Sequence, residues 1–158
     1  MKHWKSRPLT AGEIHIGQEI FSDKIDWRQI RILREKAVFF QSPEVTMAPD
    51  GNIWFHPEGR LARSEDIDDF SKSNLRIRAH LIHELTHVYQ FQHGINLVLE
   101  KVLLFFKHGP LGGYNYTRTA DEKFSSYNIE QQACILADHY TFCEENGLSM
   151  EIEMSLGE

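Results

Sequence analysis

The chain has 158 residues, of which 41% are apolar, and a formal net charge of −6. This length suffices for a substantial core, so we expect residues 1–158 to form a single domain. Because lysines and arginines are scattered and outnumbered by acidic residues, the composition argues against nucleic acid as a partner.

The N-terminal residues are basic, but no apolar stretch typical of a signal peptide follows them. We therefore expect a protein made in the bacterial cytoplasm, with residues 1–9 loosely ordered. The longest apolar run, 97–106, is interrupted by Glu100 and Lys101 and is too short to span a bilayer. No membrane partner is expected.

One helix and three short strands are predicted in the first part of the chain. Thr10 and Glu13 have the spacing of a capping box, which predicts a helix over 11–21. Three short apolar segments follow, and an Asp-Gly-Asn turn separates the last two, as is typical of a hairpin. The predicted strands lie within 28–34 and at 45–47 and 53–55.

The second part of the chain is predicted to be helical. A polar connection over 59–73 leads into apolar positions at helical spacing, and a Gly-Pro-rich break at 108–113 opens a flexible loop reaching 126. We expect the middle helix to be buried because it is strongly apolar, and residues 148–158 to be loosely held. The predicted helices cover 74–92, 97–107 and 128–146. The predicted fold class is therefore α+β, mainly helical, with a short antiparallel sheet near the N-terminal half.

His83-Glu84-Leu85-Thr86-His87 is an HExxH motif inside the first of these helices. Residues four apart lie on one helix face, so two imidazoles can bind one tetrahedral zinc, and the adjacent Glu84 can act as general base toward a metal-bound water. A random chain of this composition would contain the motif only about 0.04 times. The motif therefore predicts a zinc site with His83 and His87 as ligands.

A catalytic zinc needs a third protein ligand, and two residues are candidates. His93 has the spacing of an extended motif whose required glycine is replaced by Gln90, and in a continuous helix His93 points about 120° away from His87. Glu130, near the start of the last predicted helix, could reach the metal from a second helix. From local sequence alone, Glu130 could equally be an acidic residue that interacts favourably with the helix dipole.

The segments 83–90 and 127–135 resemble, in order and separation, the two motifs of the Vgr-related zinc metallopeptidases linked to bacterial type VI secretion. The resemblance extends through 9–14 and 47–55 and so covers most of the chain. It implies a zincin-like domain whose zinc is held by His83, His87 and Glu130, with Glu84 as base. The family's usual tryptophan after the second histidine and valine is Tyr89 here.

Supporting residues are expected around the glycine-rich loop. Metallopeptidases often use a Tyr, His or Arg opposite the metal to stabilise the carbonyl oxygen, and Tyr116 is the first candidate. The other three candidates are Tyr114, Arg118 and Tyr127. Packing of the loop is the alternative role for each of these side chains. Asp138 and His139 are candidates for orienting a ligand histidine, with surface salt bridging as the alternative.

The sequence thus predicts a zinc metallopeptidase that hydrolyses peptide bonds in a protein or peptide substrate. By the family resemblance it is a type VI secretion effector that reaches the periplasm of a rival cell, with a secretion spike and an immunity protein as partners. One alternative is a zinc-stabilised, non-catalytic adaptor module of the spike, and another is a hydrolase of cell-wall amides.

Overall fold

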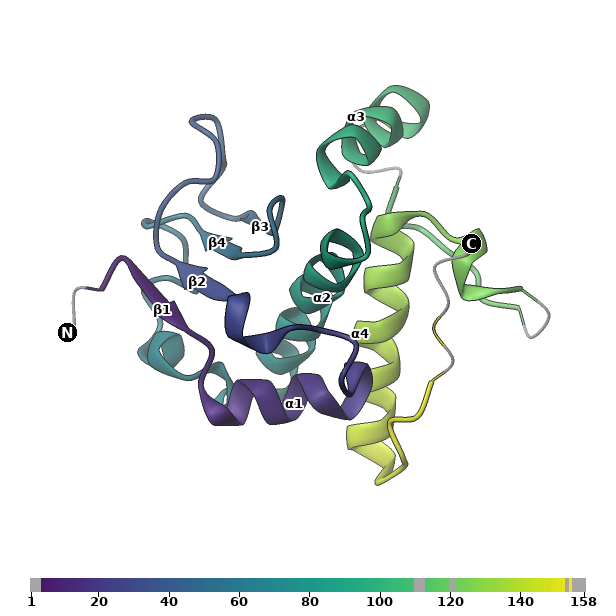
Figure 1. The fold of residues 1–158 in the computed structure, drawn as a ribbon, viewed down its shortest axis with the longest axis horizontal. Coiled ribbons are helices and arrows are strands. Elements are labelled where there is room, and N and C mark those ends of the chain that lie inside the picture. Colours follow the sequence, from purple (N-terminus) through teal and green to yellow (C-terminus); the bar gives the residue numbers. More distant parts are fainter. Residues whose placement is uncertain (1–3, 110–112, 120–121, 153, 155–158) are drawn as a thin grey trace.

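The fold places a small sheet beside a group of helices, with α2 (Leu75–Gln92) and α4 (Ile129–Asn146) side by side at the centre (Figure 1). The computed structural model describes residues 4–109, 113–119, 122–152 and 154. The predicted α+β class is confirmed, since the described chain combines four α-helices with one four-stranded sheet. No helix in these ranges is both long and apolar enough to cross a membrane.

The sheet has the strand order β1-β2-β4-β3. Its strands are β1 (Ser6–Pro8), β2 (Arg31–Leu33), β3 (Thr46–Met47) and β4 (Ile53–Phe55). The predicted β3–β4 hairpin is confirmed, with Thr46 opposite Phe55. The sheet is mixed rather than wholly antiparallel, because β4 pairs parallel to β2. The apolar β4, in which Ile53 and Phe55 are buried, is an inner strand beside β2, and β3 lies at the edge.

The predicted helices begin and end close to the expected residues. They are α1 (Ala11–Phe21), α2 (Leu75–Gln92), α3 (Leu97–His108) and α4 (Ile129–Asn146). Side chains of Thr10, Asn74, Asn96 and Asn128 cap their N-termini, and Gly147 ends α4 in the left-handed conformation at φ 61°. The described part of the chain also contains four short 3₁₀ turns: η1 (Trp27–Gln29), η2 (Glu65–Asp68), η3 (Phe70–Lys72) and η4 (Phe124–Ser126).

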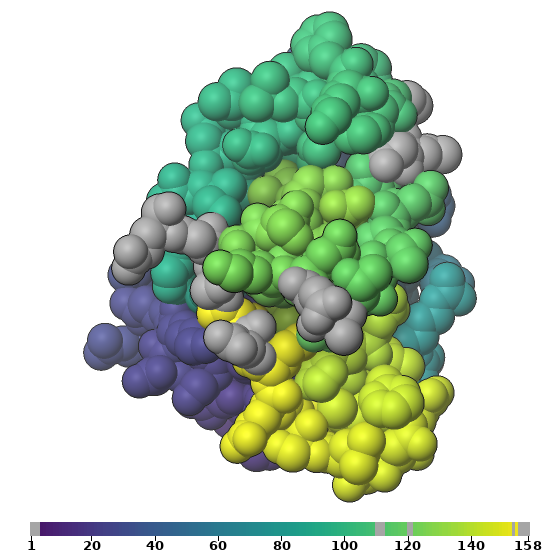
Figure 2. All heavy atoms as spheres, turned by 90° about the vertical axis from the view of Figure 1, so that its right-hand side faces the viewer, coloured from purple at the N-terminus to yellow at the C-terminus, as the bar shows by residue number. Residues whose placement is uncertain are grey.

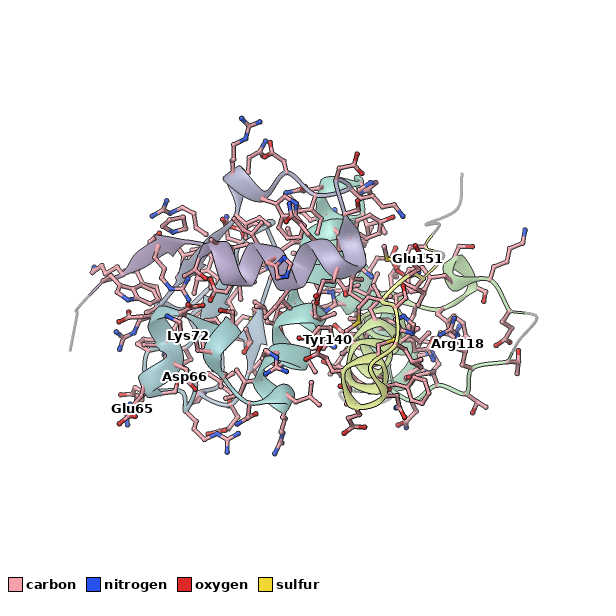
Figure 3. All side chains as sticks on the ribbon, turned by 90° about the horizontal axis from the view of Figure 1, so that it is seen from below. Glu65, Asp66, Lys72, Arg118, Tyr140 and Glu151 are labelled. Atoms are coloured by element: carbon pink, nitrogen blue, oxygen red, sulfur yellow. The ribbon has the colours of Figure 1, made fainter. Side chains whose placement is uncertain are left out.

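The core joins the sheet to α1, α2 and α4. On α2, residues such as Ile82, Leu85 and Val88 are fully buried, and each contributes about 1.5–3 kcal/mol by leaving water. On α4, Tyr140 lies on the side that faces α2 (Figure 3), and its hydroxyl accepts a hydrogen bond from Arg78 Nε at 3.1 Å. This packing fixes the rotation of α2 and α4 relative to each other, and it positions the site.

The expectation that the helix over 97–107 is buried was wrong. Only Leu97 of α3 is buried, and its other large apolar residues are mostly exposed: Val98, Leu99, Val102, Leu103, Phe105 and Phe106. Gly94, at φ 85°, turns the chain after α2, and α3 then stands out from the body (Figures 1 and 2). An apolar pattern predicts a helix with an apolar face, but it does not show which part of the protein, if any, packs against that face.

The structure describes parts of the segments that the sequence predicts to be loose or irregular. Within 1–9, residues 6–8 form β1, while 1–3 lie outside the described residues. In the C-terminal tail Met154 is buried against the core, and 153 and 155–158 lie outside the described residues. The polar connection over 59–73 forms η2 and η3, which bury Ile67 and Phe70. The loop expected over 108–126 contains η4, and its residues 110–112 and 120–121 are not described.

Candidate metal centre

The HExxH motif lies in the middle of α2, as its helical periodicity predicts. The apolar face of α2 packs into the core, which turns His83 and His87 toward α4. The two rings lie one turn apart, with centroids separated by 5.0 Å and planes at 85°. His87 is almost fully buried, and the side chain of His83 is 16% exposed. The two imidazoles therefore converge on one point between the helices.

Glu130 reaches the same point from the first turn of α4. The Asn128 side chain caps this helix by accepting hydrogen bonds from the backbone N–H groups of Glu130 and Gln131. The Glu130 carboxylate is buried, with Oε2 at 3.4 Å from His83 Nε2 and 3.3 Å from His87 Nε2. The structure therefore brings together the three residues predicted as ligands.

These three residues form a donor set that suits zinc. Two atoms bound to zinc at about 2.0–2.1 Å and separated by a tetrahedral angle lie about 3.4 Å apart. The Nε2–Oε2 separations of 3.4 and 3.3 Å match this value. Among the described side chains, His87 Nε2 and Glu130 Oε2 are buried and have no hydrogen-bond partner. Since such atoms are rarely left unpaired, they indicate a missing partner, and with His83 they form the described group of side chains that could hold a metal ion.

The charges around Glu130 hold it ionised. Burial raises the pKa of its carboxyl group, but His83, His87 and Lys101 outweigh this effect and lower the pKa well below its usual value. Burial lowers the pKa of His83, whereas Cys134 and the carboxylates of Glu130 and Glu84 raise it, to about 10 in the metal-free protein. A bound cation can take the place of this proton.

Lys101 binds the oxygen of Glu130 that the histidines do not contact. Its Nζ lies 3.0 Å from Oε1, while Oε2 faces both imidazoles. This arrangement leaves Oε2 as the one oxygen directed toward a metal. Sequence reasoning missed Lys101, since a lysine within an apolar helix carries no local pattern that relates it to a site 29 residues away.

A chain of buried amides fixes the tautomer of His87. Gln132 Nε2 donates to the carbonyl oxygens of Phe124 and Tyr127, so its Oε1 is left to accept from Gln90 Nε2 at 2.8 Å. Gln90 Nε2 also donates to the carbonyl oxygen of Ile129, so Gln90 Oε1 must face His87 Nδ1, at 2.9 Å.

An amide oxygen can only accept, and this sets the protonation of the ring. In the neutral imidazole, His87 Nδ1 therefore carries the hydrogen and Nε2 presents its lone pair to the site. The predicted acidic partner for a ligand histidine is replaced by Gln90, which is fully buried. Asp138 instead accepts from the Tyr116 hydroxyl, and His139 contacts Cys143. Neither forms a hydrogen bond to His83 or His87.

Glu84 shares an open cavity of about 410 Å³ with the three potential ligands. The Glu84 side chain is buried, its Oε1 lies 3.6 Å from His80 Nε2, and its Oε2 has no described hydrogen-bond partner. Burial is the main cause that lowers the pKa of His80, which favours a neutral ring. A carboxylate with one unpaired oxygen beside a metal can accept a proton from water.

The two tyrosines of the glycine-rich loop have different environments. Tyr114 lines the cavity with Glu84 and Glu130, and burial, followed by the charges of these carboxylates, raises the pKa of its hydroxyl. Tyr116, the first candidate from sequence, is not among the residues that line this cavity, and its hydroxyl donates to Asp138, which does line it. Tyr114 is therefore the described phenol that faces the site.

The remaining candidates lie away from the site. His93 Nδ1 forms a hydrogen bond with the backbone oxygen of Tyr89 at 2.8 Å, and His93 is absent from the described group of converging metal-binding side chains. The Tyr127 hydroxyl donates to Glu122. Arg118 lies on the loop beyond the far side of α4 (Figure 3).

Comparison with known proteins found no matching family model. The chain is 36% identical over 141 residues to the type VI secretion system spike protein VgrG2b of Pseudomonas aeruginosa, a match covering 89% of this chain but only 13% of the spike protein. The solved effector domain of P. aeruginosa VgrG2b superimposes with a TM-score of 0.79 at 34% identity, covering 91% of this chain and 79% of that domain. The chain therefore belongs to the family of the VgrG2b effector domain.

Proposed function

We propose that this protein is a zinc-dependent metallopeptidase in which His83, His87 and Glu130 hold the metal and Glu84 is the general base. One observation carries the proposal. Two Nε2 atoms and one carboxylate oxygen converge at 3.3–3.4 Å in the cavity that also contains Glu84. A purely structural zinc site is closed and has no use for a neighbouring unpaired carboxylate.

Zinc would supply a Lewis acid that polarises the substrate carbonyl and makes water more acidic. Glu84 accepts the proton of the attacking water on its unpaired Oε2 and delivers it to the leaving amine. The cavity is open enough to admit a peptide segment beside this carboxylate.

Tyr114 is the residue that we propose to stabilise the carbonyl oxygen. Its raised pKa keeps the phenol protonated at neutral pH, so the hydroxyl can donate a hydrogen bond to an oxygen that gains negative charge. Tyr116 could serve only if it exchanged its hydrogen bond with Asp138 for one with the substrate.

We infer from the comparison with VgrG2b that the protein acts as a type VI secretion effector. Its target is then protein in the periplasm of a rival cell, and its partners are a secretion spike and an immunity protein. These assignments are inferred from the family to which the chain belongs. The match covers only 13% of the spike protein, so the properties of that whole protein enter here as proposals.

Hydrolysis by the zinc-loaded protein is the direct test of the activity. We expect the wild type to cleave unstructured protein substrates, and Glu84→Gln to retain zinc while losing at least about a hundredfold in kcat/KM. Glu145→Gln, an exposed substitution on α4, is the matched control and should retain activity. Equal activity of the wild type and Glu84→Gln would refute the mechanism, and cleavage of peptidoglycan but not of proteins would refute the peptidase assignment.

A further inference from the structure

The metal cavity shares part of its wall with a second cavity of about 260 Å³. The wall of this second cavity comes from residues 43–46 at the start of β3, from the end of β4 with the loop after it, and from the first turns of α2. Five residues line both cavities: Glu44, Val45, Thr46, Arg76 and His80. A substrate bound at the metal can therefore extend into the second cavity without leaving the cleft.

The second cavity is rich in positive charge. Arg60 and Arg76 both line it, and within the described chain neither side chain forms a hydrogen bond or has a carboxylate within 4.0 Å. By contrast, Arg7 and Arg78 are held by ion pairs with acidic side chains. Arg60 and Arg76 are exposed, as is the equally unpaired Arg63, so what distinguishes these two guanidinium groups is that both line one cleft of a chain with a net charge of −6.

The other titratable groups of this cavity do not cancel that charge. Glu44 is the one acidic residue among its lining residues, and it also lines the metal cavity. His80 and His56 line the cavity too. Burial lowers the pKa of His80, so its ring adds no positive charge at neutral pH. With two arginines and one glutamate, the second cavity keeps a net positive charge.

We propose that Arg60 and Arg76 form a subsite for an acidic side chain of the substrate, which makes acidic peptides the preferred substrates. This inference rests on the proposed peptidase function. Guanidinium groups bind carboxylates through paired, directional hydrogen bonds, and a partly enclosed cleft strengthens that attraction relative to open solvent.

The spacing along α2 indicates where the acidic residue would lie. Arg76, His80 and Glu84 are four residues apart and so follow one face of α2, which places Arg76 about 12 Å along the axis from Glu84. An extended peptide advances about 3.3 Å per residue, and an arginine side chain reaches several ångströms. The acidic side chain is therefore expected two to four residues from the scissile bond, on one side of it.

The edge strand β3 supports an extended substrate. Thr46 of β3 lines both cavities, and β3 is the outer strand of the sheet on this side. An extended peptide can lie beside such an edge while its side chains enter alternate pockets.

The test combines cleavage with binding. Zinc-loaded wild type is profiled on a peptide library randomised on both sides of the scissile bond. Independently of the cleavage profile, zinc-loaded Glu84→Gln is titrated with matched fluorescent peptides that carry Glu or Gln at each position two to four residues on either side of the central peptide bond. Each arginine is expected to raise the affinity for the Glu peptide about fivefold over that for the Gln peptide. The double variant R60E/R76E should therefore lose or invert this preference. R63E is the control, because Arg63 is exposed in the same loop but does not line the cavity.

Raising the salt concentration should weaken the preference for the Glu peptide, because exposed charges are screened. Glu44→Gln should strengthen the preference. Cleavage without acidic preference would overturn the subsite and leave the peptidase function intact. If no peptide is cleaved, the binding arm still decides, because equal binding of Glu and Gln peptides, or an unchanged preference in R60E/R76E, would also overturn the subsite.

Discussion

Replacing Gln90 by methionine should weaken zinc binding without removing a zinc ligand. Gln90 is fully buried and makes three hydrogen bonds: with His87 Nδ1 at 2.9 Å, the Ile129 carbonyl oxygen at 3.0 Å and Gln132 Oε1 at 2.8 Å. Methionine has a similar volume and cannot reproduce this set. The variant therefore frees the His87 ring to rotate or to adopt the other tautomer, in which the hydrogen occupies the nitrogen directed at the metal.

The expected loss in zinc affinity is about 10–100-fold, the usual effect of removing a partner that orients a ligand histidine. This corresponds to about 1.4–2.7 kcal/mol. Two buried oxygens also lose their donor, which costs about 1–3 kcal/mol of unfolding free energy in the metal-free protein. Chelator competition measures the zinc affinity, and urea denaturation in the presence of EDTA measures the stability.

Gln92→Met separates these two effects. Gln92 lies on the same helix, but its amide binds the backbone N–H and carbonyl groups of Asp26, away from the metal. We expect Gln92→Met to lose stability and to keep the zinc affinity of the wild type. The account of the amide chain is refuted if Gln90→Met binds zinc as tightly as Gln92→Met does.

Three further predictions concern the cavity, the core and α3. Tyr114→Phe should lower kcat by at least about tenfold with zinc content unchanged, whereas Tyr116→Phe should keep a kcat near that of the wild type. The reverse ranking would favour Tyr116, the first candidate from sequence, as the residue that stabilises the carbonyl oxygen. Glu13→Gln should lower the unfolding free energy by about 3–5 kcal/mol in urea denaturation, because it breaks a buried ion pair, and a loss below about 1 kcal/mol would contradict this. Phe106→Ser should change the unfolding free energy by no more than about 0.5 kcal/mol, since this side chain is 80% exposed, whereas Leu97→Ala should lower it by about 2 kcal/mol or more. Equal losses in the two variants would show that the apolar face of α3 is covered.

Local patterns predicted the elements well, and they predicted that the two histidines share one face of a helix. The capping box at Thr10 and the cap at Asn128 are interactions within one turn, so the residues that make them are close in sequence. The HExxH spacing likewise encodes a shared helix face, and the structure places His83 and His87 together.

Tertiary features were harder to predict. The parallel pairing of β2 with β4 depends on how the strands pack against the core, and the exposure of α3 depends on the turn at Gly94. Both are decided by packing between distant segments.

Within the candidate site, only the family resemblance predicts Glu130 as a ligand, because a glutamate in the first turn of a helix has an ordinary structural role as well. The roles of Lys101 and Gln90 depend on the α2–α4 and α3–α4 contacts, which no spacing rule encodes. Tyr114 and Tyr116 could not be ranked from sequence, since which of them faces the site depends on the path of the loop.

The zinc affinity of Glu130→Gln tests the central assignment most directly. We expect the wild type to bind one zinc per chain and Glu130→Gln to bind it more weakly by at least about a hundredfold, because the substitution replaces the carboxylate that joins His83 and His87. Glu145→Gln, on the same helix, should bind zinc like the wild type. Stoichiometric zinc at wild-type affinity in Glu130→Gln would contradict the three-ligand site.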